Sequence, residues 1–161
     1  MGDYERSTSS STLAALPEAI RAAVRERAEA VQLTLADDAP AFLTHSRKVK
    51  KPGLFGRLTG TGDPDTEHLT AVVIGQRDLI AVTHGEQRGT AVLTARLEDV
   101  DVGSSIDRMA AERGDEGVTL TGFPVSVEGV TSRGSFYVGL GPPDGDDARA
   151  ALEEAVRAAK A

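Results

Sequence analysis

The hydrophobic periodicity of this chain changes near residue 40, and this change limits the folds that the chain can adopt. In the first part, apolar residues recur every three or four positions, as in an amphipathic helix: Leu16, Ile20, Val24, Ala28, Val31 and Leu35. From Ala41 the period becomes two, and Gly, Pro and Asp separate short pieces rich in β-branched residues. The pattern predicts one helix followed by a β-rich region.

Seven strands are predicted in the β-rich region, at residues 41–51, 68–75, 79–84, 89–97, 100–102, 117–123 and 135–141. The turns after Ile74 and His84 are short enough to join antiparallel neighbours, so the second to fourth strands should form a meander. No helical segment separates these strands, which excludes a doubly wound parallel sheet. Residues 104–117 fit either one or two helical turns or a strand with a long loop.

The two ends of the chain differ in character. The first twelve residues are small, polar and rich in Ser and Thr, which predicts a disordered tail over residues 1–12. The amphipathic helix follows over residues 13–36, although "VQLTL" at its end could instead be a short strand. After "PPDGDD", helical spacing predicts a second helix with one apolar face, formed by Ala148, Leu152, Ala155, Val156 and Ala159.

Composition excludes several classes of protein. At 161 residues and 40% hydrophobic content, the chain fits one domain with one core. It has no cysteine, which removes disulfides, thiolate nucleophiles and sulfur-ligated metals. The net charge of −7 argues against nucleic-acid binding. No apolar run approaches the length of a membrane span, so we expect a cytoplasmic protein without a transmembrane segment.

The order of elements, short antiparallel strands followed by one amphipathic helix, resembles a pleckstrin-homology-like domain. The stretch "HLTAVVIGQRDLIAVTHGEQRGTAVLTARLEDVDV" resembles the bacterial version of that domain, and the likeness covers residues 39–161. It implies an α+β, mainly antiparallel fold: a seven-stranded barrel of two orthogonal sheets, capped by the C-terminal helix. The helix over residues 13–36 is then an addition, which we expect to pack within the chain or in a homodimer.

One segment stands out by its charge. Between residues 39 and 62 there is no acidic residue, and the chain places cations next to an apolar pair: Arg47, Lys48, Lys50, Lys51 and Arg57 beside Leu54 and Phe55. By the resemblance, this segment is the first strand and the loop to the second, where lipid-binding members hold anionic head groups. The K/R-x-R of those members is replaced by His68-Leu69-Thr70, so a specific phosphoinositide pocket is not predicted. A contact site and a solvated strand with its loop are both open.

Other motifs carry little chemistry. Asp63, Asp65 and Glu67 alternate as at the start of a calcium loop, but His68 and Ile74 stand where that loop needs Gly and Glu, so a solvated turn is predicted. The histidines His45, His68 and His84 lack the i, i+4 spacing of a helical zinc site and are expected at or near the surface. No nucleophile elbow, phosphate loop or dinucleotide fingerprint occurs. We therefore predict no catalytic residue, metal or cofactor.

These observations favour a noncatalytic binding module that recognises a protein or peptide. The alternative is weak peripheral binding to an anionic membrane or another polyanion through residues 47–57, at the inner membrane surface. A third class, a small enzyme with its site in the mouth of the barrel, would need convergent titratable groups that the sequence does not reveal.

Overall fold

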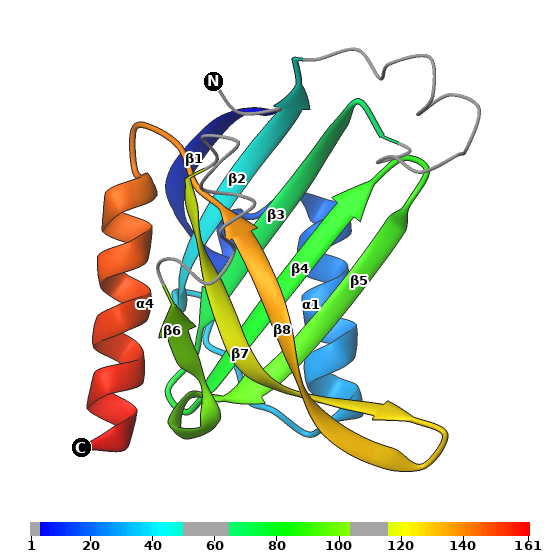
Figure 1. Ribbon diagram of the computed structural model, residues 1–161, viewed down its shortest axis with the longest axis vertical. Helices are drawn as coiled ribbons and strands as arrows, with labels where there is room; N and C mark the ends of the chain where they lie inside the picture. The colour runs from blue at the N-terminus through cyan, green and yellow to red at the C-terminus, as the bar shows by residue number, and fades with distance from the viewer. Residues whose placement is uncertain (1–3, 50–64, 104–115) are drawn as a thin grey trace.

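The computed structural model describes residues 4–49, 65–103 and 116–161, and it shows an α+β fold with antiparallel strands in two sheets (Figure 1). The five-stranded sheet has the order β1-β2-β3-β4-β5, and the three-stranded sheet has the order β6-β7-β8. The strands are β1 Tyr4–Thr12, β2 Pro40–Lys48, β3 Glu67–Ile74, β4 Asp78–Gly85, β5 Gly89–Arg96, β6 Asp101–Gly103, β7 Gly117–Val127 and β8 Val130–Gly139. The helices are α1 Glu18–Ala30 and α4 Gly145–Lys160, with short 3-10 turns η1 Leu13–Ala15 and η2 Leu97–Asp99. The antiparallel α+β class and the C-terminal helix are as predicted.

The five-stranded sheet is covered on both faces. Helix α1 packs on one face, and the three-stranded sheet and α4 pack on the other (Figure 1). Successive residues of a strand point to opposite faces, so β3 sends Val73 toward α1 and Val72 toward α4. Likewise β4 sends Ile80 and Ala81 to opposite cores. The middle of each central strand is therefore an unbroken apolar run.

Helix α1 buries its apolar stripe inside the chain, through Ile20, Val24 and Ala28. It is shorter than the predicted 13–36 helix. Gln32 has a φ of 59°, and the N–H of Leu33 donates to the carbonyl of Ala28 at 2.7 Å. This hydrogen bond is typical of a Schellman motif, which normally has glycine at the position of positive φ. Because Gln32 stands there instead, the sequence gives no signal that the helix ends at this point.

Strand β1 contradicts the predicted disordered tail at residues 4–12. It pairs with the whole of β2, from Tyr4 opposite Lys48 to Thr12 opposite Pro40. Its other edge meets the segment that follows β8: the N–H of Thr8 donates to the Pro142 carbonyl, and the N–H of Asp144 donates to the Thr8 carbonyl, both at 3.1 Å. Main-chain hydrogen bonds on both edges order a strand that has little apolar surface. The sheet thus begins at Tyr4, well before residue 39.

The predicted closed, seven-stranded barrel is not found. Among the described residues, the hydrogen-bonded ladders join β1 to β5 and β6 to β8 but do not join the two sheets into a ring. The added strand β1 occupies the outer edge of β2, and a single parallel bridge, Thr8 to Pro143, links it to the segment after β8. On the other side, η2 turns the chain from β5 into β6. The result is two separate sheets packed face to face.

Helix α4 buries Ala148, Leu152 and Val156 in the core between the sheets. Asp146 and Asp147 lie in its first turn and complement the positive end of the helix dipole. At the other end, the Lys160 ammonium lies 2.6 Å from the Asp101 carboxylate on β6. Within the described part of the chain, neither helix combines the length and hydropathy that crossing a bilayer requires.

Candidate functional site

The predicted basic site is only partly described. Arg47 and Lys48 end strand β2, whereas Lys50, Lys51, Leu54, Phe55 and Arg57 lie outside the described residues. Arg47 is opposite Glu5 on β1 and Glu67 on β3, and it forms an ion pair with Glu5. The hydrogen bond from Arg47 to Glu5 raises the pKa of the guanidinium. The acidic residues that the local sequence lacks are thus supplied by the neighbouring strands.

The surface around Arg47 carries both signs of charge. His45 lies 3.1 Å from Glu67, and these groups line a shallow hollow of about 460 Å³ together with Glu5, Arg6, Ser7, Arg47 and Pro142. Lys48 follows Arg47 in the strand, so its side chain leaves the opposite face of the sheet. Arg47 and Lys48 therefore do not converge on one anion.

The face of β1, β2 and β3 that looks toward the three-stranded sheet carries two rows of polar side chains, of which Ser46 and the three threonines are buried and Arg6 and His68 are half-buried. Arg6, Ser46 and His68 are in register across the three strands, and Thr8, Thr44 and Thr70 form the next row. The hydroxyls of Thr8 and Thr44 share a hydrogen bond of 2.8 Å, and the Gly141 N–H donates to the Thr8 hydroxyl at 3.0 Å. These bonds satisfy polar groups that are shielded from water.

Arg6, at the end of the row that also contains Ser46 and His68, lies between two tyrosines. Its guanidinium carbon lies 5.0 Å from the centre of the Tyr4 ring and 5.9 Å from that of Tyr137, within cation–π range. The Tyr4 and His68 rings meet edge to face at 5.5 Å. Gly139 leaves the space that Arg6 occupies, since a Cβ there would overlap the Arg6 side chain. The cluster joins β1 to β8 and has a structural role.

Asp65 is buried, contrary to the predicted solvated turn. Its carboxylate accepts hydrogen bonds from the Gln87 N–H at 2.7 Å, and from the main-chain and side-chain N–H groups of Arg88 at 3.1 Å. These donors, the Gln87 N–H above all, lower the pKa of Asp65. Gly85 makes room, because a Cβ there would overlap the carboxylate. Asp65 thus anchors the β4–β5 turn.

In the described ranges, no group of three or more His, Asp or Glu side chains lies close enough together to hold a metal ion.

The feature most suited to contact another molecule is the far end of the β7–β8 hairpin, residues 124–133, which we call the arm. It extends past β6 and past the five-stranded sheet, at the lower right of Figure 1. Its two-residue turn, Glu128-Gly129, has positive φ at both positions, as a type I′ turn requires. Val127 and Val130 flank the turn and are 62% and 69% exposed. They are the most exposed of the large apolar side chains in the described residues.

The two edges of the arm differ in their main-chain groups. The residues that flank a two-residue turn form a hydrogen-bonded pair, and such pairs alternate with pairs whose N–H and C=O point outward. By this alternation Ser126 and Pro124 point outward on β7, and Thr131 and Arg133 point outward on β8. Pro124 has no N–H, which interrupts the β7 edge. The β8 edge keeps its full set of donors and acceptors.

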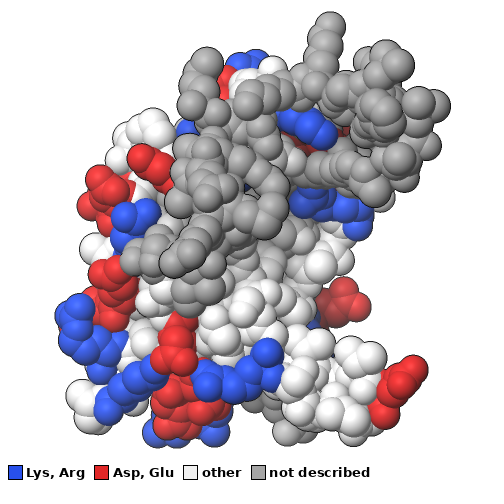
Figure 2. All heavy atoms as spheres, in the orientation of Figure 1, with Lys and Arg blue, Asp and Glu red and all other residues white. Residues whose placement is uncertain are grey.

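The base of the arm is fixed to the body by Arg133. Its guanidinium donates to the Asp99 carbonyl at 2.6 Å and lies 3.2 Å from the Asp101 carboxylate. A hollow of about 580 Å³ lies beside the arm, lined by Glu98, Asp99, Asp101, Gly122, Pro124, Thr131, Ser132, Arg133 and Lys160. In Figure 2, acidic and basic side chains are mixed at this end of the molecule, while the projecting part is mostly uncharged.

The sequence analysis missed the arm because it ended one strand at Phe123 and began the next at Ser135. The signal was present in "VSVEGV", where Val125 and Val127 alternate before a glycine. Register places Val125, Val127 and Val130 on one face of the arm, and this is the face on which Phe123 enters the core. The apolar face of the three-stranded sheet therefore continues beyond the part that the body covers.

Comparisons with protein-family models, with curated proteins and with solved structures give no match. Function is therefore inferred from the arm, its edges and its surroundings.

Proposed function

We propose that this chain is a noncatalytic, cytoplasmic binding module of pleckstrin-homology-like architecture, and that it binds an extended segment of a partner protein along the arm. The order of elements supports the architecture: β2 to β5 form one meander, β6 to β8 form a second, and α4 follows. Strand β1 and helix α1 are additions to that plan. The resemblance is one of topology, and the proposed binding rests on the arm.

The observation that carries the proposal is the exposure of Val127 and Val130 beside the open edge of β8. A two-stranded ribbon is at best marginally stable alone in water, and a third strand would stabilise it. Full burial of a valine side chain contributes about 1.5 kcal/mol or more. A partner that covers both valines and pairs with the β8 edge would gain binding free energy from the burial of the valines and from the main-chain hydrogen bonds.

The mode of binding that fits is strand addition. Main-chain groups of Thr131 and Arg133 would pair with an extended segment, which provides affinity without regard to sequence. Alternate side chains of that segment would lie beside Val130, and large ones would extend over it toward Val127, which provides selectivity for apolar residues at every second position. The β7 edge is less suited to this pairing because Pro124 interrupts it.

The membrane alternative receives less support from the described residues. Arg47 is paired with Glu5 and borders Glu67, and Lys48 leaves the opposite face. A flat anionic surface would therefore meet two carboxylates together with the one guanidinium. A second copy of this chain could also supply the added strand, and the state of association distinguishes that donor from a foreign one.

The proposal is tested by selecting a displayed library of random peptides on the full chain. Enriched peptides should have apolar residues at alternate positions, and they should lose binding to the double variant Val127→Ser, Val130→Ser. The matched control is Val31→Ser, which changes a valine of 37% exposure at the end of α1. Peptides that bind all three proteins equally would place the site elsewhere and contradict the proposal. Sedimentation velocity on the same proteins shows whether a second copy is the partner.

A further inference from the structure

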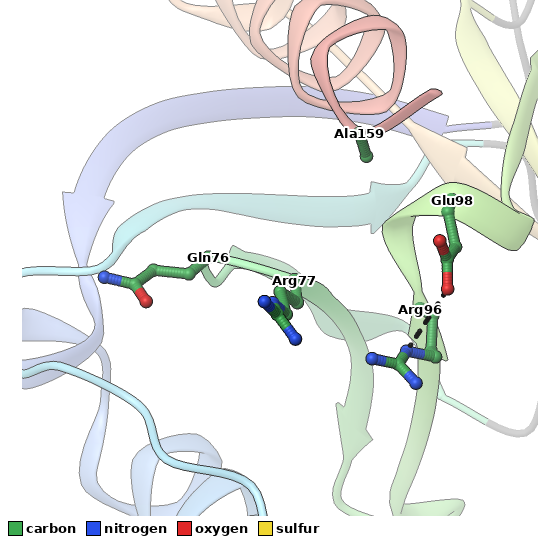
Figure 3. Close-up of a pocket in the computed structure, with 5 residues that line it drawn as sticks. All are labelled: Gln76, Arg77, Arg96, Glu98 and Ala159. Carbon is green, nitrogen blue, oxygen red and sulfur yellow. Dashed lines mark ion pairs between the residues drawn. The ribbon is translucent and has the colours of Figure 1, made fainter. Parts of the chain in front are cut away.

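Two arginines converge near the base of the arm, on a pocket of about 460 Å³ (Figure 3). Arg77 comes from the β3–β4 turn, and Arg96 is the last residue of β5. Gln76, Glu98 on η2 and Ala159 on α4 complete the lining. Figure 3 shows the Arg77 and Arg96 side chains directed toward the same space.

Main-chain bonds fix where the two side chains start. The N–H of Gly75 donates to the Asp78 carbonyl at 2.8 Å and closes the β3–β4 turn. The N–H of Leu97, which follows Arg96, donates to the Arg77 carbonyl at 2.8 Å. The two arginines thus rise from hydrogen-bonded neighbouring segments, so their positions do not depend on a loose loop.

The charges in the pocket are incompletely matched. Among the described residues, Arg96 has one acidic ion-pair partner, Glu98, whose carboxylate lies 3.6 Å away, beyond hydrogen-bond range, and both side chains are more than half exposed. Asp78 lies opposite Arg96 in the β4–β5 ladder but does not line the pocket. Arg77 has no ion pair with any described residue. The carbonyl end of α4 lies near Ala159 and is weakly negative, and the cations of its last turn, Arg157 and Lys160, are paired with Glu154 and Asp101. The pocket therefore has an excess of positive charge in a chain whose net charge is −7.

We propose that Arg77 and Arg96 bind a small oxyanion, namely a phosphate or carboxylate group of a ligand. A guanidinium presents its N–H donors as a planar fork, and two forks directed at one space can surround such a group. The bound anion takes the place of Glu98 as the partner of Arg96. Anion binding at this site does not require an added strand. A negative result for binding along the arm would therefore leave this proposal unchanged, and the reverse also holds.

Inorganic phosphate is the probe, titrated into the full ¹⁵N-labelled chain at constant ionic strength and followed by amide chemical shifts. The shifts should saturate and be largest at Gln76, Arg77 and Arg96. Arg77→Gln and Arg96→Gln should each weaken binding about tenfold or more, since each removes a charge-assisted bond. Glu98→Gln should strengthen binding, because it removes the competing carboxylate. Acetate should move the same amides.

The matched control is Arg27→Gln, which removes an exposed arginine on the outer side of α1 and should leave phosphate binding unchanged. Far-ultraviolet circular dichroism checks that each variant is folded. Vesicles of phosphatidylcholine, with and without phosphatidic acid, identify the source of the anion. Vesicle binding that Arg77→Gln abolishes indicates a lipid head group, and phosphate binding without vesicle binding indicates a small molecule. Shifts that do not saturate, or that persist in the Arg77→Gln, Arg96→Gln double variant, overturn the proposal.

Discussion

The main-chain N–H of Gly141 donates a hydrogen bond to the side-chain hydroxyl of Thr8, a residue 133 positions earlier in the chain, at 3.0 Å. The same hydroxyl shares a bond with Thr44, and the Thr8 main chain bonds to the segment after β8. One buried threonine thus connects β1, β2 and the approach to α4. This explains how a strand made mostly of serine and threonine is held in the fold.

Replacing Thr8 with valine keeps the shape of the side chain and removes the hydroxyl. We expect a loss of about 1 to 3 kcal/mol in the free energy of unfolding, because the Gly141 N–H and the Thr44 hydroxyl lose a buried partner. Urea denaturation measures the loss. The control is Ser7→Ala, an exposed neighbour on the same strand that should change stability by less than about 0.5 kcal/mol. Equal stability of the two variants would contradict this role of Thr8.

Gly141→Ala should also destabilise the fold, for a steric reason. A Cβ at residue 141 would overlap the carbonyl oxygen of Arg6, so β1 and the segment after β8 would have to separate. The control is Gly129→Ala in the arm, where no atom lies near the Cβ position although a positive φ disfavours alanine. Thermal unfolding should show the larger loss for Gly141→Ala, together with faster hydrogen exchange along β1.

Leu152→Ala tests the packing of α4 between the sheets. Leu152 is fully buried, and truncation of such a side chain costs about 2 to 5 kcal/mol. Its exposed neighbour Glu153 provides the control, because Glu153→Ala should leave the urea midpoint nearly unchanged. If Leu152→Ala unfolded at the same urea concentration as Glu153→Ala, α4 would not be part of the core.

The lowered pKa of Asp65 leads to a prediction of how the free energy of unfolding depends on pH. The native donors lower its pKa, so its contribution is complete above the ordinary aspartate pKa of about 4 and is lost as the pH falls through the lower native value. Asp65→Asn should be less stable than the wild-type chain at pH 7, and the difference should shrink below pH 4. Thr8→Val, which removes a hydroxyl that does not titrate in this range, should differ from the wild-type chain by the same amount at every pH. A constant difference between Asp65→Asn and the wild-type chain from pH 7 to pH 3 would contradict this role.

Hydrophobic periodicity predicted correctly those elements whose buried face can be recognised from the spacing of their own apolar residues. Helix α4 was predicted because Leu152 and Val156 recur at helical intervals, and β3 and β4 were predicted because their middles are apolar throughout. The antiparallel meander followed from short turns. In each case the information is local, within about twenty residues of the element concerned.

The features that the sequence analysis did not predict depend on contacts between residues far apart in the chain. The ion pair of Arg47 uses Glu5, which lies in a segment that composition assigned to a tail. The burial of Asp65 depends on donors in another turn, at Gln87 and Arg88. The predicted barrel lacked β1, which occupies the outer edge of β2, and no count of strands after residue 41 could anticipate this strand. Charge and hydrophobicity along the chain do not encode such partners directly.

The most direct test of strand addition along the arm compares two proline variants with the same change on opposite edges. Thr131 and Ser126 face each other across the arm, and each directs its N–H outward, Thr131 on β8 and Ser126 on β7. The measurement is the dissociation constant of a library-selected peptide for the wild-type chain, Thr131→Pro and Ser126→Pro. Strand addition on β8 predicts that Thr131→Pro weakens binding about tenfold or more, while Ser126→Pro binds like the wild-type chain. Equal affinity of all three, or a loss confined to Ser126→Pro, would contradict it.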